Sequence, residues 1–123
     1  MTDLTRASVL LVEDSPSLSR VYREYLRNEP YRLTAVETGA AALAALAEQP
    51  PDAILLDLKL PDMGGMDILH HITGNRLPIA VGVITAHGSI SVAVDAMRGG
   101  AHYFLVKLNS SHDQISYSVF CLK

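Results

Sequence analysis

The stretch AILLD at residues 53–57 decides the fold of this chain, because four apolar residues run directly into a carboxylate. Three other runs have the same form: VLLV at 9–12 before Glu13-Asp14, IAVGVI at 79–84 before Thr85, and FLV at 104–106 before Lys107. Short Val, Ile and Leu runs without polar alternation are typical of strands buried on both faces of a parallel sheet. The sequence therefore predicts such a sheet, whose strands end on polar residues.

Helical patterns separate the apolar runs. Ser15 and Pro16 indicate a helix start, because serine caps helices and proline suits the first helical position. Further helix starts are predicted at Thr38-Gly39 and Ser89, with a weaker strand at 31–36. A third helix carries Ile68, Leu69 and Ile72 and ends near Gly74-Asn75, whereas Pro50-Pro51 and Gly99-Gly100 end the second and fourth helices. The alternation predicts an α/β fold: a five-stranded parallel sheet, doubly wound, with helices on both faces.

Composition limits the class of protein. The chain has 123 residues, a formal charge of −3 and a single cysteine, Cys121. No apolar run approaches the roughly 18 residues that span a bilayer, and the first residues lack a secretory signal pattern. We therefore expect a cytoplasmic domain without membrane contact. The acidic balance argues against direct binding of nucleic acid by this domain.

Residues 108–123 do not fit the alternating pattern. A fifth covering helix would complete the architecture here, but Ile115, Tyr117 and Val119 alternate with serines, as in a strand. The predicted domain therefore spans residues 1–107, with its core at 8–107. Residues 108–123 are left as an atypical C-terminal tail: a poor final helix, a disordered segment or residues that are not native.

The polar strand ends define a candidate site. In an open parallel sheet, ligands bind outside the carboxyl ends of the strands. Three carboxylates there, Glu13, Asp14 and Asp57, repel one another unless they take up a proton or bind a cation, and an all-oxygen ligand set suits Mg²⁺. Lys107 and Thr85 add an ammonium and a hydroxyl for phosphate oxygens. These groups favour phosphoryl transfer, with the Asp57 carboxylate as acceptor nucleophile.

The chain resembles the receiver domain of bacterial two-component response regulators. The matching stretches are VLLVED at 9–14, LLDLKLPDMGG at 55–65, ITAHG at 84–88 and GAHYFLVK at 100–107. Between residues 87 and 101, the sequence most resembles regulators of the nitrogen-regulation type. The resemblance implies a flavodoxin-like fold with strand order 2-1-3-4-5.

The resemblance also implies roles for individual residues. Asp57 is the expected phosphoacceptor. Asp14 and Asp57 are expected to bind Mg²⁺ directly, the backbone carbonyl of Lys59 to be a third ligand, and Glu13 to act through water. Thr85 and Lys107 are expected to contact the attached phosphoryl group.

Phosphorylation is expected to act as a switch. The resemblance places Phe104 at the aromatic switch position, where it turns into space that Thr85 leaves, so that the surface of the fourth helix and the last strand changes. The donor is expected to be a phosphohistidine on a sensor histidine kinase or phosphotransfer protein. The changed surface would control an output domain or partner, with transcription regulation as the outcome, and a homodimer through this surface is compatible with the family. Such a domain catalyses only its own phosphorylation and dephosphorylation.

Departures from the family pattern leave alternatives open. Leu108 stands where proline usually follows the lysine, which keeps a phosphorylation-independent receiver-like interaction module under consideration. A Mg²⁺-dependent phosphohydrolase with an aspartyl intermediate would need a second acid two residues after the nucleophile, where this chain has Lys59. Flavin binding would need a Ser/Thr/Gly-rich phosphate loop after the first strand, which the sequence lacks.

Overall fold

Strands and helices alternate along most of the computed structural model, which describes residues 7–25, 27–85, 90–109 and 115–120. The elements are β1 (Ala7–Val12), α1 (Pro16–Tyr25), β2 (Tyr31–Val36), α2 (Gly39–Glu48), β3 (Ala53–Asp57), α3 (Gly65–Gly74), β4 (Ala80–Thr85), α4 (Ile90–Arg98), β5 (Tyr103–Asn109) and β6 (Ile115–Phe120).

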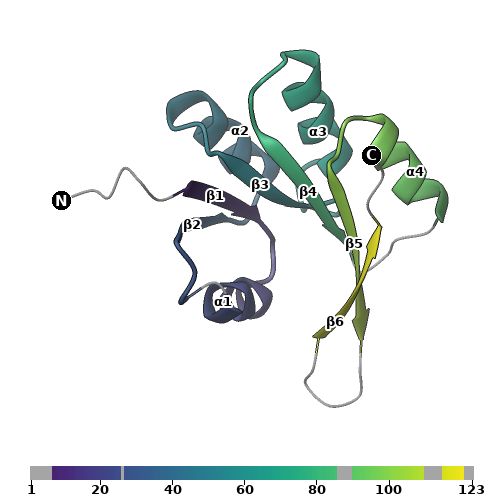
Figure 1. Ribbon diagram of the computed structural model, residues 1–123. Coiled ribbons are helices and arrows are strands. Elements are labelled where there is room, and N and C mark those ends of the chain that lie inside the picture. The colour runs from purple at the N-terminus through teal and green to yellow at the C-terminus, as the bar shows by residue number, and fades with distance from the viewer. Residues whose placement is uncertain (1–6, 26, 86–89, 110–114, 121–123) are drawn as a thin grey trace.

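One sheet connects all the described strands, in the order β2-β1-β3-β4-β5-β6 (Figure 1). Strands β1 to β5 pair in parallel, and β6 pairs antiparallel with β5. The predicted parallel α/β architecture is confirmed, and the first five strands follow the order 2-1-3-4-5. The sheet differs from the five-stranded prediction because β6 extends it by one strand.

The C-terminal region explains this difference. The sequence predicts that this strand stops at Lys107. In the structure, β5 continues to Asn109. Leu108 keeps its backbone N–H, which a proline there would lack, so the strand can continue and pair with β6. Residues 115–120 form that strand, in keeping with the alternation of Ile115, Tyr117 and Val119. The alternative of a poor final helix is therefore wrong for residues 115–120, which form a strand.

The larger part of the core lies on one face of the sheet, under α2, α3 and α4 (Figure 1). Ile54 and Leu56 of the central strand β3 are fully buried there, together with Ile68 and Leu69 of α3. The cluster also contains buried side chains of β1, β4, α2 and α4, among them Leu10, Val12, Val81, Val83, Ala42, Leu46, Ala93 and Ala96. Three helices therefore fix the position of β3 from this side.

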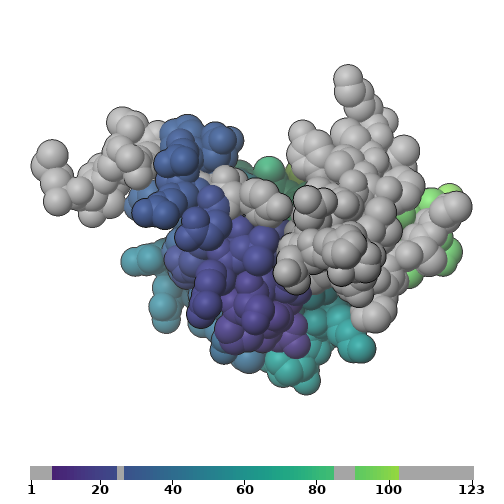
Figure 2. Space-filling model, turned by 90° about the horizontal axis from the view of Figure 1, so that it is seen from below, coloured from purple at the N-terminus to yellow at the C-terminus, as the bar shows by residue number. Residues whose placement is uncertain are grey.

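Helix α1 covers the opposite face and lies toward the viewer in Figure 2. The buried cluster beneath it consists of Leu11, Tyr22 and Ile84. Leu55 of β3 is only half-buried on this side, although its neighbours Ile54 and Leu56 are fully buried. The two layers are thus unequal in the described part of the chain, and β3 is held mainly from the α2–α4 side.

The helix starts agree with the sequence where they are described. The Ser15 hydroxyl accepts a hydrogen bond from the N–H of Leu18 (3.4 Å), and Pro16 is the first residue of α1. Thr38 caps α2 by accepting from Ala41 (3.1 Å). Gly100, with φ of 110°, follows α4 in a conformation that favours glycine. The predicted cap Ser89 lies outside the described residues.

Candidate functional site

Three carboxylates meet at the carboxyl edge of the sheet. Strands β1 and β3 are parallel neighbours, with Val12 opposite Leu56, so Glu13 and Asp14 emerge beside Asp57. One carboxylate oxygen from each of the three lies within 4.8 Å of the other two. The predicted acidic cluster is thus brought together by the pairing of two strands 40 residues apart along the chain.

The three carboxylates differ in exposure. Glu13 is only 3% exposed; its Oε1 accepts from the N–H of Ser15 (3.2 Å), and its own N–H donates to the carbonyl of Val36 (3.0 Å). Asp14 is exposed, and Asp57 is half-buried. One carboxylate is therefore held deep in the fold, while Asp57 and Asp14 remain accessible from outside.

The cluster fits a divalent cation. Three carboxylates at this separation repel one another, and a bound cation removes that repulsion. All the donors are hard oxygens, which suits Mg²⁺ and related ions better than zinc or copper. The N–H of Lys59 donates to Asp57 Oδ1 (3.0 Å), which orients the carboxylate and begins the loop after β3.

Backbone contacts join the two ends of that loop, residues 58–64. The N–H of Gly65 donates to the carbonyl of Leu58 (2.9 Å), and Lys59 and Gly64 form an isolated antiparallel bridge. Leu60 is buried in the main core. The backbone around Lys59, whose carbonyl is a predicted metal ligand, therefore sits in a short loop with a fixed base.

Asp62 is the residue that the sequence did not single out. Its carboxylate accepts from the N–H groups of Gly39 (2.8 Å) and Ala40 (2.9 Å), at the start of α2. These two hydrogen bonds favour the ionised form and lower the pKa of Asp62 below its ordinary value. One signal in the sequence could have indicated this contact. The first turn of α2 is Gly-Ala-Ala-Ala and contains no acidic residue of its own, so the N-terminus of the helix is open to a carboxylate from elsewhere.

The backbone brings Thr85 and Lys107 to the same edge. Asp57 pairs with Ile84, so Thr85 is the next position along β4; Thr85 in turn pairs with Val106, which precedes Lys107. Lys107 also pairs with Tyr117 of β6. Phe104 lies three residues earlier in β5, opposite Val83.

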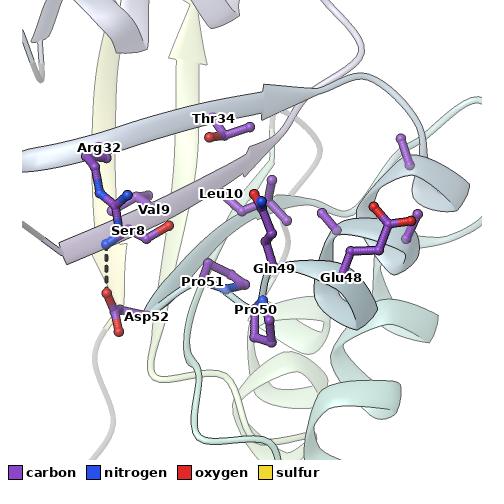
Figure 3. A pocket seen from close by; sticks show the side chains of 13 residues that line it. Ser8, Val9, Leu10, Arg32, Thr34, Glu48, Gln49, Pro50, Pro51 and Asp52 are labelled. Atoms are coloured by element: carbon purple, nitrogen blue, oxygen red, sulfur yellow. Dashed lines mark hydrogen bonds between the residues drawn. The ribbon is translucent and has the colours of Figure 1, made fainter. Parts of the chain in front are cut away.

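A hollow of about 670 Å³ lies away from these carboxylates, beside the beginnings of β1 and β2 (Figure 3). The second half of α2 and the connection that follows it form its other wall, including Glu48, Gln49 and Asp52. Asp52 is engaged with the N–H of Ser8 (2.7 Å). The hollow and the acidic cluster are separate features, and the chemistry predicted from the sequence belongs to the cluster.

The helices that the structure describes are all too short or too polar to cross a membrane.

Comparison with known proteins gives consistent matches. Residues 9–117 match the family model of the response regulator receiver domain. The chain is 45% identical over 97 residues to the regulatory protein LuxO of Vibrio vulnificus, which covers 79% of this chain and 21% of LuxO. The chain thus spans about a fifth of that relative.

Two solved structures agree with the fold. The signal receiver domain of a putative LuxO repressor protein from Vibrio parahaemolyticus superposes with a TM-score of 0.82 at 47% identity, covering 85% of this chain and 81% of that one. The Mn²⁺-bound form of the response regulator Rcp1 gives 0.80 at 30% identity, covering 87% and 85%. The family match spans most of the chain, and the resemblance read from the strand ends is confirmed: this chain belongs to the response regulator receiver domain family.

Proposed function

We propose that this chain is a phosphorylation-dependent signalling receiver that accepts a phosphoryl group on Asp57 in the presence of Mg²⁺. The main support is that carboxylate oxygens of Glu13, Asp14 and Asp57 lie within 4.8 Å of one another at the carboxyl edge of the sheet. Family membership supports the same role, and so does the Mn²⁺-bound form of Rcp1, a relative at 30% identity.

The chain's own residues would hold the metal. Asp14 and Asp57 supply direct carboxylate ligands, the carbonyl of Lys59 a third, and Glu13 acts through water from its buried position. Bound Mg²⁺ would neutralise charge on the incoming phosphoryl oxygens. Thr85 and Lys107, next to each other at the same edge, are proposed to contact the phosphoryl group through a hydroxyl and an ammonium.

The acceptor step requires one new bond. A carboxylate oxygen of Asp57 forms a bond to phosphorus while the P–N bond to the imidazole of a donor phosphohistidine breaks, and the imidazole nitrogen keeps the electron pair. We propose a sensor histidine kinase or phosphotransfer protein in the cytoplasm as the donor. The exposure of Asp14 and the half-exposure of Asp57 allow that approach.

The signal is proposed to leave through α4 and β5. Thr85 would move toward the phosphoryl group and Phe104 would turn into the space it leaves, which changes the α4–β5 surface presented to an output domain or partner. Changing a 1:99 population to 99:1 needs a preference of about 5.5 kcal/mol between the two states. Transcription regulation is the proposed outcome, and a homodimer through α4–β5 is compatible with it.

Intact-mass measurement after incubation with acetyl phosphate tests the proposal. We expect a gain of one phosphate that requires Mg²⁺ and is lost at alkaline pH, as expected of an acyl phosphate. A parallel incubation with EDTA is the control. Absence of the gain, under conditions where calorimetry detects Mg²⁺ binding, would contradict phosphorylation and favour the alternative below.

The alternative is a receiver-like interaction module that works without phosphorylation. The β5–β6 hairpin favours it, because Lys107 lies within a strand that continues to Asn109 and pairs with Tyr117. In the family pattern, a proline after the lysine would end the strand. A module of this kind would bind Mg²⁺ at the acidic cluster but give no mass gain.

Replacing Thr85 by alanine separates acceptance from response. Because the proposed acceptor oxygen belongs to Asp57, we expect Thr85→Ala still to take up phosphate, at a reduced rate because one hydrogen-bond donor to the phosphoryl group is lost. The change of the α4–β5 surface should be much weaker than in wild type. Amide hydrogen exchange over 90–109, with and without acetyl phosphate, measures that response. A wild-type response in the variant would remove Thr85 from the switch.

A further inference from the structure

The loop that follows Asp57 is attached to a second element, the beginning of α2. Asp62 accepts hydrogen bonds from Gly39 and Ala40, at 2.8 and 2.9 Å. Met63 lies against Gly39 so closely that a Cβ on that glycine would overlap the Met63 side chain. Two neighbouring side chains of the loop therefore contact the first turn of α2, and the N–H groups that Asp62 binds lie 22 and 23 residues earlier in the sequence.

We propose that Asp62 is a positioning residue for the metal: by tying the 58–64 loop to the N-terminus of α2, it sets the position of the Lys59 carbonyl beside Asp57. This inference rests on the proposed function, because it concerns the same Mg²⁺ site. It extends that function by adding α2 to the structure that holds the metal ligands.

The hydrogen bonds from α2 to Asp62 stabilise the helix, because they satisfy N–H groups that have no partner within it. The first four N–H groups of a helix have no partner within the helix. In α2, the hydroxyl of the N-cap residue Thr38 satisfies one of them, at Ala41. Asp62 satisfies two more, at Gly39 and Ala40. Its negative charge also lies at the positive end of the helix, whose own first turn has no acidic residue.

Few residues separate Asp62 from the proposed metal ligands, so the position of Asp62 affects the position of those ligands. Lys59 is three residues before Asp62, its N–H donates to Asp57 Oδ1 (3.0 Å), and it bridges to Gly64. A shift of the loop therefore moves the Lys59 carbonyl and the Asp57 carboxylate together. Mg²⁺ requires near-ideal octahedral geometry with ligands at about 2.0–2.1 Å, so a displacement of a few tenths of an ångström weakens its binding.

Asp62→Asn tests the proposal, because the side chain keeps its shape and loses its charge and one acceptor oxygen. We expect the Kd for Mg²⁺, measured by calorimetry, to rise roughly three- to tenfold, less than for a residue bonded directly to a ligand. The Mg²⁺ concentration for half-maximal labelling by acetyl phosphate should rise equally, while the maximal rate at saturating Mg²⁺ stays near wild type. A residue with a purely structural role would not produce this split.

Glu48→Gln is the matched control, because it removes the same charge from an exposed residue at the other end of α2. It should leave the Mg²⁺ affinity unchanged. Met63→Ala provides a second route, since it loosens the same junction without changing charge, and should weaken Mg²⁺ binding in the same direction. Circular dichroism confirms that each variant is folded at the assay temperature.

The outcomes separate the two ideas. If wild type neither binds Mg²⁺ nor takes up phosphate, the proposed function fails. If wild type does both, and Asp62→Asn and Met63→Ala bind Mg²⁺ as tightly as Glu48→Gln, the positioning role of Asp62 is overturned. An equal loss of maximal rate at every Mg²⁺ concentration would also overturn it, because the effect would then not act through the metal.

Discussion

Replacing Asp57 by asparagine is expected to abolish labelling of this chain by acetyl phosphate. The change is nearly isosteric, so the end of β3 and its hydrogen bond from Lys59 can persist, but the amide is a very poor nucleophile. It also removes one of three carboxylates within 4.8 Å, and with it one of the proposed direct metal ligands. Intact mass should show the unmodified variant under conditions that fully modify wild type.

Asp67→Asn is the control for this prediction, because Asp67 is an exposed carboxylate in the first turn of α3, outside the cluster. It should be labelled like wild type. Retention of the phosphate in Asp57→Asn would contradict the assignment, and peptide mapping would then show whether Glu13 or Asp14 had accepted it. Loss in both variants would show that labelling depends on charge in general rather than on Asp57.

The fold was predictable because its strongest signals are local. Residues 53–56 form an apolar run, and a run buried on both faces belongs to the interior of a parallel sheet. The structure places this segment in the centre of the sheet, as β3. The meeting of Asp57 with Glu13 and Asp14 follows from the same rule, since strands that run in one direction end at one edge.

Two features were not predicted: one depends on a distant partner, and for the other the sequence carried two competing signals. Asp62 bonds to N–H groups 22 and 23 residues earlier in the chain, and an exposed aspartate in a loop carries no local sign of such a partner. The β5–β6 hairpin was obscured for another reason. The architecture favoured a helix after Lys107, while the alternation of Ile115, Tyr117 and Val119 favoured a strand, and the strand is what forms.

Gly65→Ala is expected to damage both stability and phosphorylation. A Cβ at Gly65 would overlap the carbonyl oxygen of Asp57 and lie 2.7 Å from the Cα of Leu58. Both are backbone atoms, so they cannot move aside as a flexible side chain could. Overpacking of this kind costs about 1–3 kcal/mol in the free energy of unfolding. A displaced Asp57 also loses reactivity, on the order of a hundredfold for 1 Å.

Neighbouring glycines give this prediction its controls. A Cβ at Gly64 meets only Asp67 Oδ2, at 3.7 Å, and a Cβ at Gly74 meets no described atom within 4 Å. Gly64→Ala and Gly74→Ala should therefore be labelled by acetyl phosphate at nearly the wild-type rate, and thermal unfolding should show little loss. If Gly65→Ala matched them in both measurements, the backbone at Asp57 would have to yield without cost. Since this backbone carries the proposed acceptor, that result would mean that the reaction tolerates movement of Asp57, contrary to the demands of an aligned attack on phosphorus.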